Sequence, residues 1–284
     1  MSEYAHPETL VSTEEVASRL GEPSLHIVEI DEDTAAFDRG HIPGAVAMDW
    51  RQELQDPRRR GVIARDAFER LLSAKGIDQD SDVVLYGGNN NWFAAYGYWY
   101  FKYFGHRRVR LMDGGRKKWE LEGRPLTSDA PRVSATTYRA ATEDTSIRAV
   151  RDQVLTETRR TPMVDVRSPE EYAGVLSAPA HLPQEQAQRS GHIPGAANVP
   201  WSRAAREDGS FKPADELRSI YMEGAGLSAD DPVIAYCRIG ERSSHTWFVL
   251  HELLGFDKAR NYDGSWTEYG SLVDVPVERE DGSG

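Results

Sequence analysis

"DRGHIPGAVAMDW", residues 38–50, returns later in the chain as "RSGHIPGAANVPW", residues 189–201. Two further pairs of segments keep the same order and nearly the same separation: "VVLYGG" (83–88) with "VIAYCR" (233–238), and "VRLMDGGRKKW" (109–119) with "ARNYDGSWTEY" (259–269). A separation of this length is far too long for a solenoid repeat. The sequence therefore predicts two copies of one domain.

Each copy alternates short apolar runs with segments of helical spacing. The predicted strands are 26–30, 82–86 and 109–112 in the first copy, and 162–166, 232–236 and 259–262 in the second. Helical spacing is clearest in 65–76 and in 245–255, which ends at Gly255, a residue favoured just after a helix. Strands that alternate with helices predict an α/β fold, with a central parallel sheet flanked by helices in each copy.

The boundaries between the copies follow from composition. Residues 126–147 are polar and have little periodicity, which indicates a linker between domains at 1–125 and 148–284. The second copy also carries extra residues within 173–189, before its "GHIPGA". Long loops in compact domains are often functional, but a neutral surface excursion is an equal alternative.

Bulk composition narrows the function classes. The chain has 284 residues and a formal net charge of -12, which argues against nucleic acid or an anionic membrane as the main partner. Its single cysteine excludes an intramolecular disulfide and a cysteine zinc cluster, and fits a reducing cytoplasm, where we expect the protein. The first residues do not resemble a signal peptide. The uncharged stretch 83–101 is interrupted by "GGNNN", so we expect strand, turn and helix there, not a membrane span.

The cysteine lies in "AYCRIGERSSHTW", residues 235–247, directly after a predicted strand. In open parallel sheets, ligands bind beyond the carboxyl ends of the strands. The next helix is expected to begin near Ser243, and its N-terminus carries a partial positive charge. With Arg238 and Arg242 close in sequence, this arrangement predicts a lowered pKa and a thiolate for Cys237 at neutral pH.

The rest of the loop supports an anion site. Gly240 allows the backbone to curl and turn its N–H groups inward, whereas Glu241 opposes the arginines. A buried structural cysteine is the alternative, and it is disfavoured by the strand-end position and the two arginines. The spacing is C-x4-R, one residue shorter than the C-x5-R of cysteine phosphatases, so a cradle for a single sulfur atom is the better interpretation.

In combination, these motifs resemble a known family. The tandem "GHIPGA", "VDVRSPEEY" (164–172), "DGSW" (263–266) and the loop "CRIGER" (237–242) are similar to the rhodanese superfamily, and above all to bacterial tandem-domain thiosulfate sulfurtransferases. The resemblance covers nearly the whole chain. It implies two rhodanese-like domains, of which only the second is catalytic, because Gly87 stands where the second copy has Cys237.

The resemblance implies a double displacement. The thiolate would take the outer sulfur of thiosulfate and pass it from a persulfide to cyanide or a thiol, with no metal or organic cofactor. Cys237 would be the nucleophile, and Arg238 and Arg242 would oppose the charge of the sulfonate. Backbone N–H groups of the loop would hold the persulfide; these belong to Arg238, Ile239, Gly240, Glu241, Arg242 and Ser243.

Other residues are assigned less directly. Trp92 and Phe93 fall where animal members carry an aromatic pair that lines an interdomain cleft. Arg167 is a further candidate for the cleft wall, or it pairs with Asp165 beside it. The histidines of the two "GHIPGA" segments are expected to be structural, because the copy without cysteine has one too.

The sequence also departs from the animal enzymes. Ile239 stands in place of a lysine, and Glu171 stands in place of an arginine. The substrate anion must therefore be bound in part by other residues than in the animal enzymes. The uncharged loop CG[ST]GV[TA] of mercaptopyruvate sulfurtransferases is absent, which favours thiosulfate as the donor. 3-Mercaptopyruvate sulfurtransfer stays open as an alternative, and so does a persulfide carrier that delivers sulfur to a protein partner.

Overall fold

The computed structural model describes residues 3–178 and 186–280, and its backbone forms two compact units. The first unit contains residues 8–144 together with 205–211. The second contains residues 145–204, those from 212 onward, and the segment before Glu8. The predicted domain boundaries, with a linker at 126–147, stay a prediction. Part of the predicted insertion, residues 179–185, lies outside the described residues.

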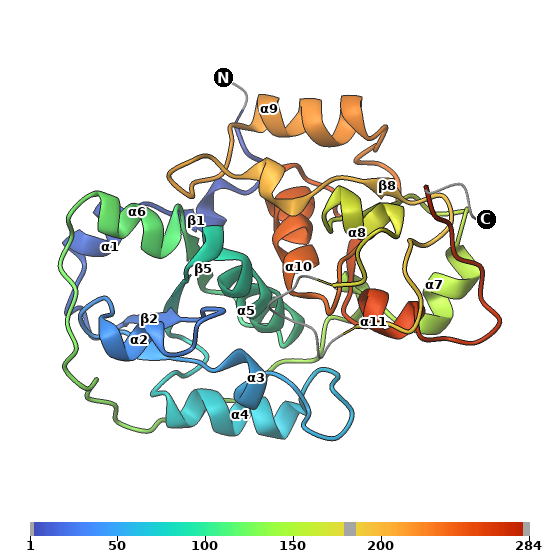
Figure 1. The fold of residues 1–284 in the computed structure, drawn as a ribbon. Helices are drawn as coiled ribbons and strands as arrows, with labels where there is room; N and C mark the ends of the chain where they lie inside the picture. Colours follow the sequence, from blue (N-terminus) through green and yellow to red (C-terminus); the bar gives the residue numbers. More distant parts are fainter. Residues whose placement is uncertain (1–2, 179–185, 281–284) are drawn as a thin grey trace. The chain divides into compact units, whose positions relative to one another are not determined.

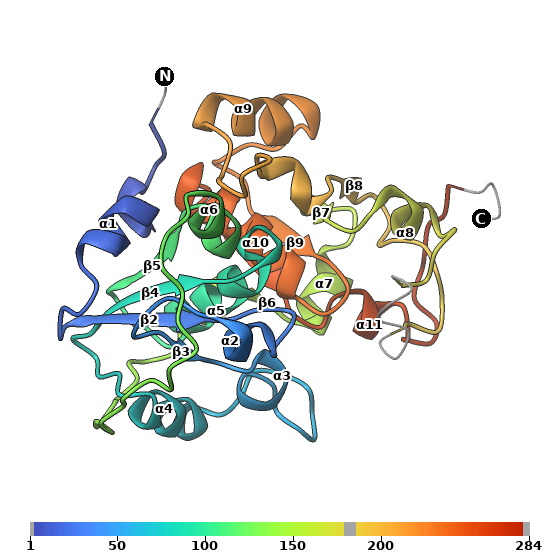
Figure 2. The ribbon, with the colours of Figure 1, turned by 60° about the vertical axis from the view of Figure 1, so that its left-hand side comes forward.

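The first unit is built on a five-stranded parallel sheet in the order β1-β5-β4-β2-β3. Its strands are β1 (Leu10–Val11), β2 (Leu25–Glu29), β3 (Val46–Ala47), β4 (Asp82–Tyr86) and β5 (Val109–Met112). Its helices are α1 (Thr13–Ser18), α2 (Ala36–Arg39), α3 (Trp50–Glu53), α4 (Arg65–Ala74), α5 (Trp92–Tyr103) and α6 (Gly115–Leu121), with a short 3-10 turn at Asn89–Asn91. Another 3-10 turn, Pro7–Thr9, begins at the last residue of the segment that belongs to the second unit. Figure 2 shows β2, β4 and β5 side by side.

The second unit repeats this plan, with the order β6-β10-β9-β7-β8, all parallel. Its strands are β6 (Arg148–Ala149), β7 (Met163–Asp165), β8 (Ala197–Asn198), β9 (Val233–Tyr236) and β10 (Ala259–Tyr262). Its α-helices are α7 (Arg151–Glu157), α8 (Pro169–Ala173), α9 (Ala214–Arg218), α10 (Glu241–Phe248) and α11 (Ser265–Tyr269), and 3-10 turns cover Thr145–Ile147 and Trp201–Ala204 (Figure 1). Wider π-helical turns at Ser219–Gly224 and Val249–Leu253 extend α9 and α10.

The predicted α/β class is confirmed, with two tandem domains of the same topology. All six predicted strands form, each within one residue of its predicted limits. Both central strands, β4 and β9, are completely buried, as parallel strands covered on both faces must be. The helix α5 is also buried along nearly its whole length. None of the helices in the described residues has the length and apolar character needed to span a bilayer.

The repeated "GHIPGA" segment makes the same contacts in both units. The N–H of Ile42 donates to the hydroxyl of Tyr86 at 3.1 Å, and the N–H of Ile193 donates to that of Tyr236 at 3.0 Å. Each tyrosine is the last residue of the central strand. The segment therefore ties a loop to the carboxyl end of the sheet.

The histidine of each "GHIPGA" segment is structural, as predicted. The rings of His41 and His192 stack on Phe37 and Tyr172, with ring centroids 3.7 Å apart in both units. Each Nδ1 lies 2.9 Å from the backbone carbonyl of the residue on which its ring stacks. A ring held in this way packs the loop against the neighbouring helix.

Candidate active site

The cysteine lies where the sequence places it, at the carboxyl end of the central strand of the second unit. β9 ends at Tyr236, Cys237 follows, and α10 begins at Glu241, two residues earlier than predicted. Gly240 joins loop to helix with φ +98°, in the left-handed region that favours glycine. A Cβ atom there would lie 2.7 Å from the Cα atom of Asp263, so any side chain would disturb the turn.

The sulfur atom is enclosed by hydrogen-bonding groups. The N–H of Gly240 donates to Sγ at 3.1 Å, and the Ser243 hydroxyl lies 3.6 Å from it. The thiol itself donates to Oε2 of Glu241, 3.3 Å away. Cys237 has no exposed surface. Inward N–H groups were predicted for this loop, and that of Gly240 reaches the sulfur.

Both loop arginines are paired with carboxylates. Arg242 forms a two-pronged hydrogen-bonded ion pair with Glu171, at 2.8 and 3.1 Å. Arg238 lies 3.4 Å from Oε1 of Glu241. Because all four residues are at most 5% exposed, these are buried charges that neutralise one another.

The predicted lowering of the thiol pKa is wrong. Burial raises the pKa of Cys237, and the negative charge of Glu241 raises it further. The positive charge of Arg242 and the hydrogen bonds of Ser243 lower the pKa, but they do not outweigh burial. Proximity in sequence suggested two free cations, whereas the fold gives each arginine a carboxylate partner.

Glu171 was recognised as a departure from the family pattern but not as a partner of Arg242. It lies at the start of α8, where its backbone N–H donates to the Ser168 hydroxyl and its own carboxylate accepts from the Ser168 N–H. This is the capping box that "SPEE" predicts. Burial pushes the pKa of Glu171 upward, but the Arg242 hydrogen bonds and charge outweigh it, and the net pKa is lowered.

A second layer of polar groups holds the loop. Oδ1 of Asn261, in β10, accepts from the Ser243 hydroxyl at 2.6 Å, and its Nδ2 donates to the Gly240 carbonyl at 3.1 Å. The Cys237 N–H donates to the Ser265 hydroxyl at 3.0 Å. Sequence reasoning missed Asn261, although a signal exists: a polar residue occupies a buried strand where the first copy has Leu111.

Arg167 takes the structural alternative. Its guanidinium pairs with Asp165 at 2.5 Å, donates to the carbonyl of Gly191 at 2.7 Å, and lies 4.7 Å above the ring of Trp266. In the first unit Arg116, from α6, makes the matching bond to the carbonyl of Gly40 at 2.7 Å. An arginine thus supports "GHIPGA" in both units, and a role of Arg167 in the cleft wall stays a prediction.

The remaining predicted site residues are placed as follows. Ile239 is 3% exposed within the loop. Trp92 and Phe93 begin α5 in the first unit and are 8% and 2% exposed. Phe93 stacks on Trp50 with ring centroids 4.5 Å apart, which is core packing. Their role in a cleft wall stays a prediction.

Gly87 marks the position in the first unit that matches Cys237. A Cβ atom on Gly87 would lie 2.1 Å from the carbonyl oxygen of Ile30, so the backbone leaves no room for a side chain. Its N–H donates to Oδ1 of Asn91 at 2.9 Å, and Nδ2 of Asn91 donates to the carbonyl of Met112 at 2.7 Å. An asparagine side chain thus fills the space beside this strand end.

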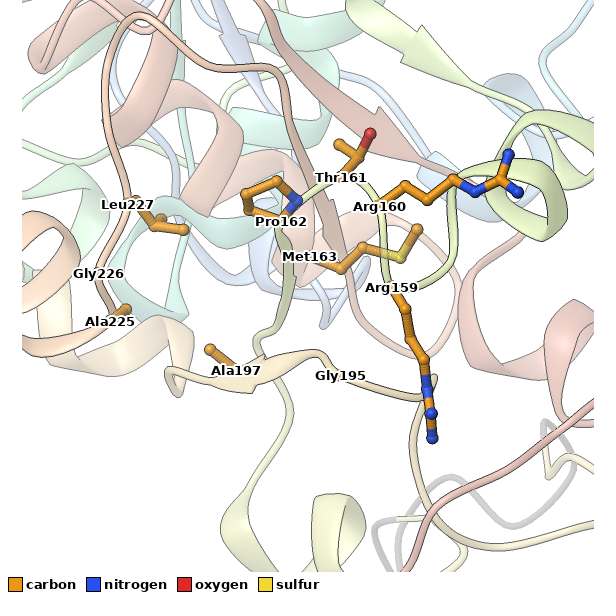
Figure 3. A pocket seen from close by; sticks show the side chains of 10 residues that line it. All are labelled: Arg159, Arg160, Thr161, Pro162, Met163, Gly195, Ala197, Ala225, Gly226 and Leu227. Carbon is orange, nitrogen blue, oxygen red and sulfur yellow. The ribbon is translucent and has the colours of Figure 1, made fainter.

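One cavity of the second unit lies at the amino ends of the strands, opposite the carboxyl end that carries Cys237. Its volume is about 410 Å³, and Figure 3 shows the residues around it: Arg159, Arg160, Thr161, Pro162, Met163, Gly195, Ala197, Ala225, Gly226 and Leu227. Met163 begins β7, so the cavity faces the amino end of that strand. Parallel sheets place their ligands at the carboxyl ends, which favours the Cys237 loop over this cavity. Among the described residues, no group of three or more His, Cys, Asp or Glu is arranged to hold a metal ion.

Comparisons with known proteins agree with this geometry. The rhodanese-like domain model matches residues 12–122 and 150–272. A Saccharopolyspora erythraea protein named "Putative thiosulfate sulfurtransferase" is 62% identical over 95% of this chain and 96% of its own length. The "Sulfur carrier protein TtuD" of Thermus thermophilus is 51% identical over 97% of this chain and 98% of its own.

Among solved structures, SseA from Escherichia coli, described with the 3-mercaptopyruvate sulfotransferases, superposes with a TM-score of 0.77 at 25% identity. The superposition covers 91% of this chain and 98% of that one. Two matched domains and close relatives along the whole chain place it in one family. The chain belongs to the rhodanese-like domain family of sulfurtransferases.

Proposed function

We propose that this protein takes sulfane sulfur from thiosulfate onto Cys237 and passes it to cyanide or a small thiol. The observation that carries the proposal is the sulfur at the end of β9, 3.1 Å from an inward N–H group and beside the first turn of α10. The N-terminus of a helix and an inward N–H group stabilise negative charge. Both the N-terminus of α10 and the Gly240 N–H would therefore stabilise a persulfide anion on Cys237.

The reaction has two steps. The Sγ electron pair forms a bond to the outer sulfur of thiosulfate, the sulfur–sulfur bond of the donor breaks, and sulfite leaves with the bonding pair. The acceptor nucleophile then attacks the terminal sulfur of the persulfide, and the Cys237 sulfur is released. This is covalent catalysis by a nucleophile that is regenerated in each cycle.

Thiosulfate is preferred over mercaptopyruvate on the grounds of charge. Arg238 and Arg242 are the cations of the loop, and a dianion gains more from them than a monoanion whose carboxylate lies further from the sulfur. The pairs with Glu241 and Glu171 mean that an incoming sulfonate must exchange with, or share, a bound carboxylate. Relatives named for thiosulfate support the same donor.

A persulfide carrier is the second candidate, and one observation favours it. The relative that is 51% identical over nearly the full length is named a sulfur carrier protein. In that case, a protein would accept the sulfur from Cys237, and turnover with small acceptors would be slow.

Steady-state kinetics separate these candidates. We expect kcat/KM with thiosulfate to exceed that with mercaptopyruvate, with cyanide or a thiol as acceptor, and Cys237→Ser to abolish both activities. Turnover with mercaptopyruvate alone would reassign the donor. Persulfide formation without turnover to any small acceptor would favour the carrier.

A further inference from the structure

Glu241 lies between the nucleophile and an arginine. Its Oε2 accepts the thiol hydrogen bond of Cys237 at 3.3 Å, and its Oε1 lies 3.4 Å from Nη2 of Arg238. The residue opens α10 and has no exposed surface. A buried carboxylate in contact with a buried thiol is well placed to exchange a proton with it.

The balance of charge in the site makes this contact significant. The side chains of Arg238, Arg242, Glu171 and Glu241 sum to zero while the thiol is protonated. Loss of its proton to solvent would leave a net negative charge in a site that is at most 5% exposed, which is costly. Transfer of the proton to Glu241 creates the thiolate and keeps the sum at zero.

We propose that the Glu241 carboxylate is the general base that accepts the proton of Cys237 when the thiol becomes a nucleophile. This inference takes the sulfur donor, thiosulfate, from the proposed function, but the proton step does not depend on it. The S–H bond breaks toward Oε2, the sulfur electron pair bonds to the outer sulfur of thiosulfate, and sulfite leaves. Protonated Glu241 then no longer repels the persulfide anion, and it returns the proton to Sγ when the acceptor removes the sulfur.

The charged groups around Glu241 come from several elements. Cys237 and Arg238 of the loop and Arg242 of α10 contact Glu241 directly. Further out, Glu171 of α8 pairs with Arg242, and Asp263, which lies next to Gly240, is paired with Arg148. The nearest cation to its carboxylate is Arg238, whose Nη2 lies 3.4 Å from Oε1.

The test uses the rate at which iodoacetamide, a small neutral reagent, alkylates Cys237 as a function of pH. In Glu241→Gln we expect alkylation about 100-fold slower than in the wild type near pH 6, within the usual range for a lost general base. The rate should then rise with pH until it equals or exceeds the wild type at alkaline pH. Glu241→Asp should restore part of the rate near pH 6.

Glu171→Gln is the matched control, because it also removes one buried negative charge but does not touch the sulfur. It should alkylate as fast as the wild type or faster. If Glu241→Gln is as fast as the wild type near pH 6, the carboxylate only repels the thiolate and the proposal is overturned.

The outcome is separate from that of the proposed function. Alkylation needs no thiosulfate, so the pH profiles would still identify the base if thiosulfate proved not to be the donor. Circular dichroism of each variant checks that the fold is retained.

Discussion

The proposed nucleophile, Cys237, is a fully buried thiol whose pKa is raised by burial and by the neighbouring carboxylate of Glu241. Its local cations are held in ion pairs with Glu171 and Glu241. The four charged side chains therefore sum to zero while the thiol is protonated, and the proposed donor would bring negative charge to the site. This arrangement suits a thiol that is activated during the reaction more than one that waits as a thiolate.

The Arg242–Glu171 pair gives a prediction about stability. Arg242→Met leaves the Glu171 carboxylate buried without its partner, which should cost about 3–5 kcal/mol in the free energy of unfolding. The double variant Arg242→Met/Glu171→Gln should recover much of this loss. Urea unfolding of the wild type and the variants measures it, and additive losses in the double variant would contradict the pairing.

The same pair predicts how this difference depends on pH. The folded pKa of Glu171 is lowered from its ordinary value of 4.5, so its stabilising contribution is present above that pH and is lost as the pH falls through the folded pKa. The gap in stability between the wild type and Arg242→Met should therefore narrow below about pH 4.5. Urea unfolding repeated at acidic pH checks this prediction. A stability difference that grows as the pH falls would contradict it.

For single residues, the sequence indicates which residues belong to the candidate site better than it indicates which side chains they contact. Cys237 and Gly240 were found because a strand end and a turn are local features. The partner of Arg242 was not, because Glu171 is brought to it only by tertiary folding. Asn261 was missed for a similar reason: its bonds to Ser243 and Gly240 cross from one element to another.

At the scale of elements, the loop between β9 and α10 is fixed from two sides. Asn261 in β10 bonds to the carbonyl of Gly240 at the end of the loop and to the Ser243 hydroxyl in the first turn of α10, and Ser265 at the start of α11 accepts from the Cys237 N–H. The loop between β4 and α5 has the same place in the first unit, but Asn91 fills the space beside it. The loop after β9 therefore has room for the Cys237 side chain, whereas the loop after β4 has no room for a side chain at Gly87.

This difference predicts that the first unit cannot be made active by one substitution. In Gly87→Cys/Cys237→Ser, the new Cβ atom would meet the Ile30 carbonyl oxygen at 2.1 Å, so the strand end must shift. We expect a lower thermal unfolding temperature than in Cys237→Ser and no sulfur transfer from thiosulfate to cyanide. A folded double variant with most of the wild-type turnover would refute this.

The alternation of apolar runs was enough to predict the longer elements. β4 and α4 begin at the predicted residues because their patterns are long and their ends carry clear signals. The two-residue edge strands β1, β3, β6 and β8 were not predicted, because a pair of residues has no periodicity. They form because their backbones hydrogen-bond to a neighbouring strand, and that strand comes from another part of the chain.

At the scale of the whole molecule, two copies of one topology carry different chemistry. Both units use the "GHIPGA" segment, the tyrosine that ends the central strand, and an arginine to brace the carboxyl end of the sheet. The arginine comes from α6 in one unit and follows β7 in the other. The two units therefore share a scaffold but not its side chains, and the second unit alone has a cysteine after its central strand, where the first has Gly87.

The central claim is that Cys237 carries the transferred sulfur, and intact-protein mass spectrometry tests it most directly. Wild-type protein mixed with thiosulfate alone should gain the mass of one sulfur atom, because the chain has no second cysteine to resolve a persulfide. Cyanide should then remove that mass, and Cys237→Ser should gain nothing. An unchanged wild-type mass, or an equal gain in Cys237→Ser, would contradict the account.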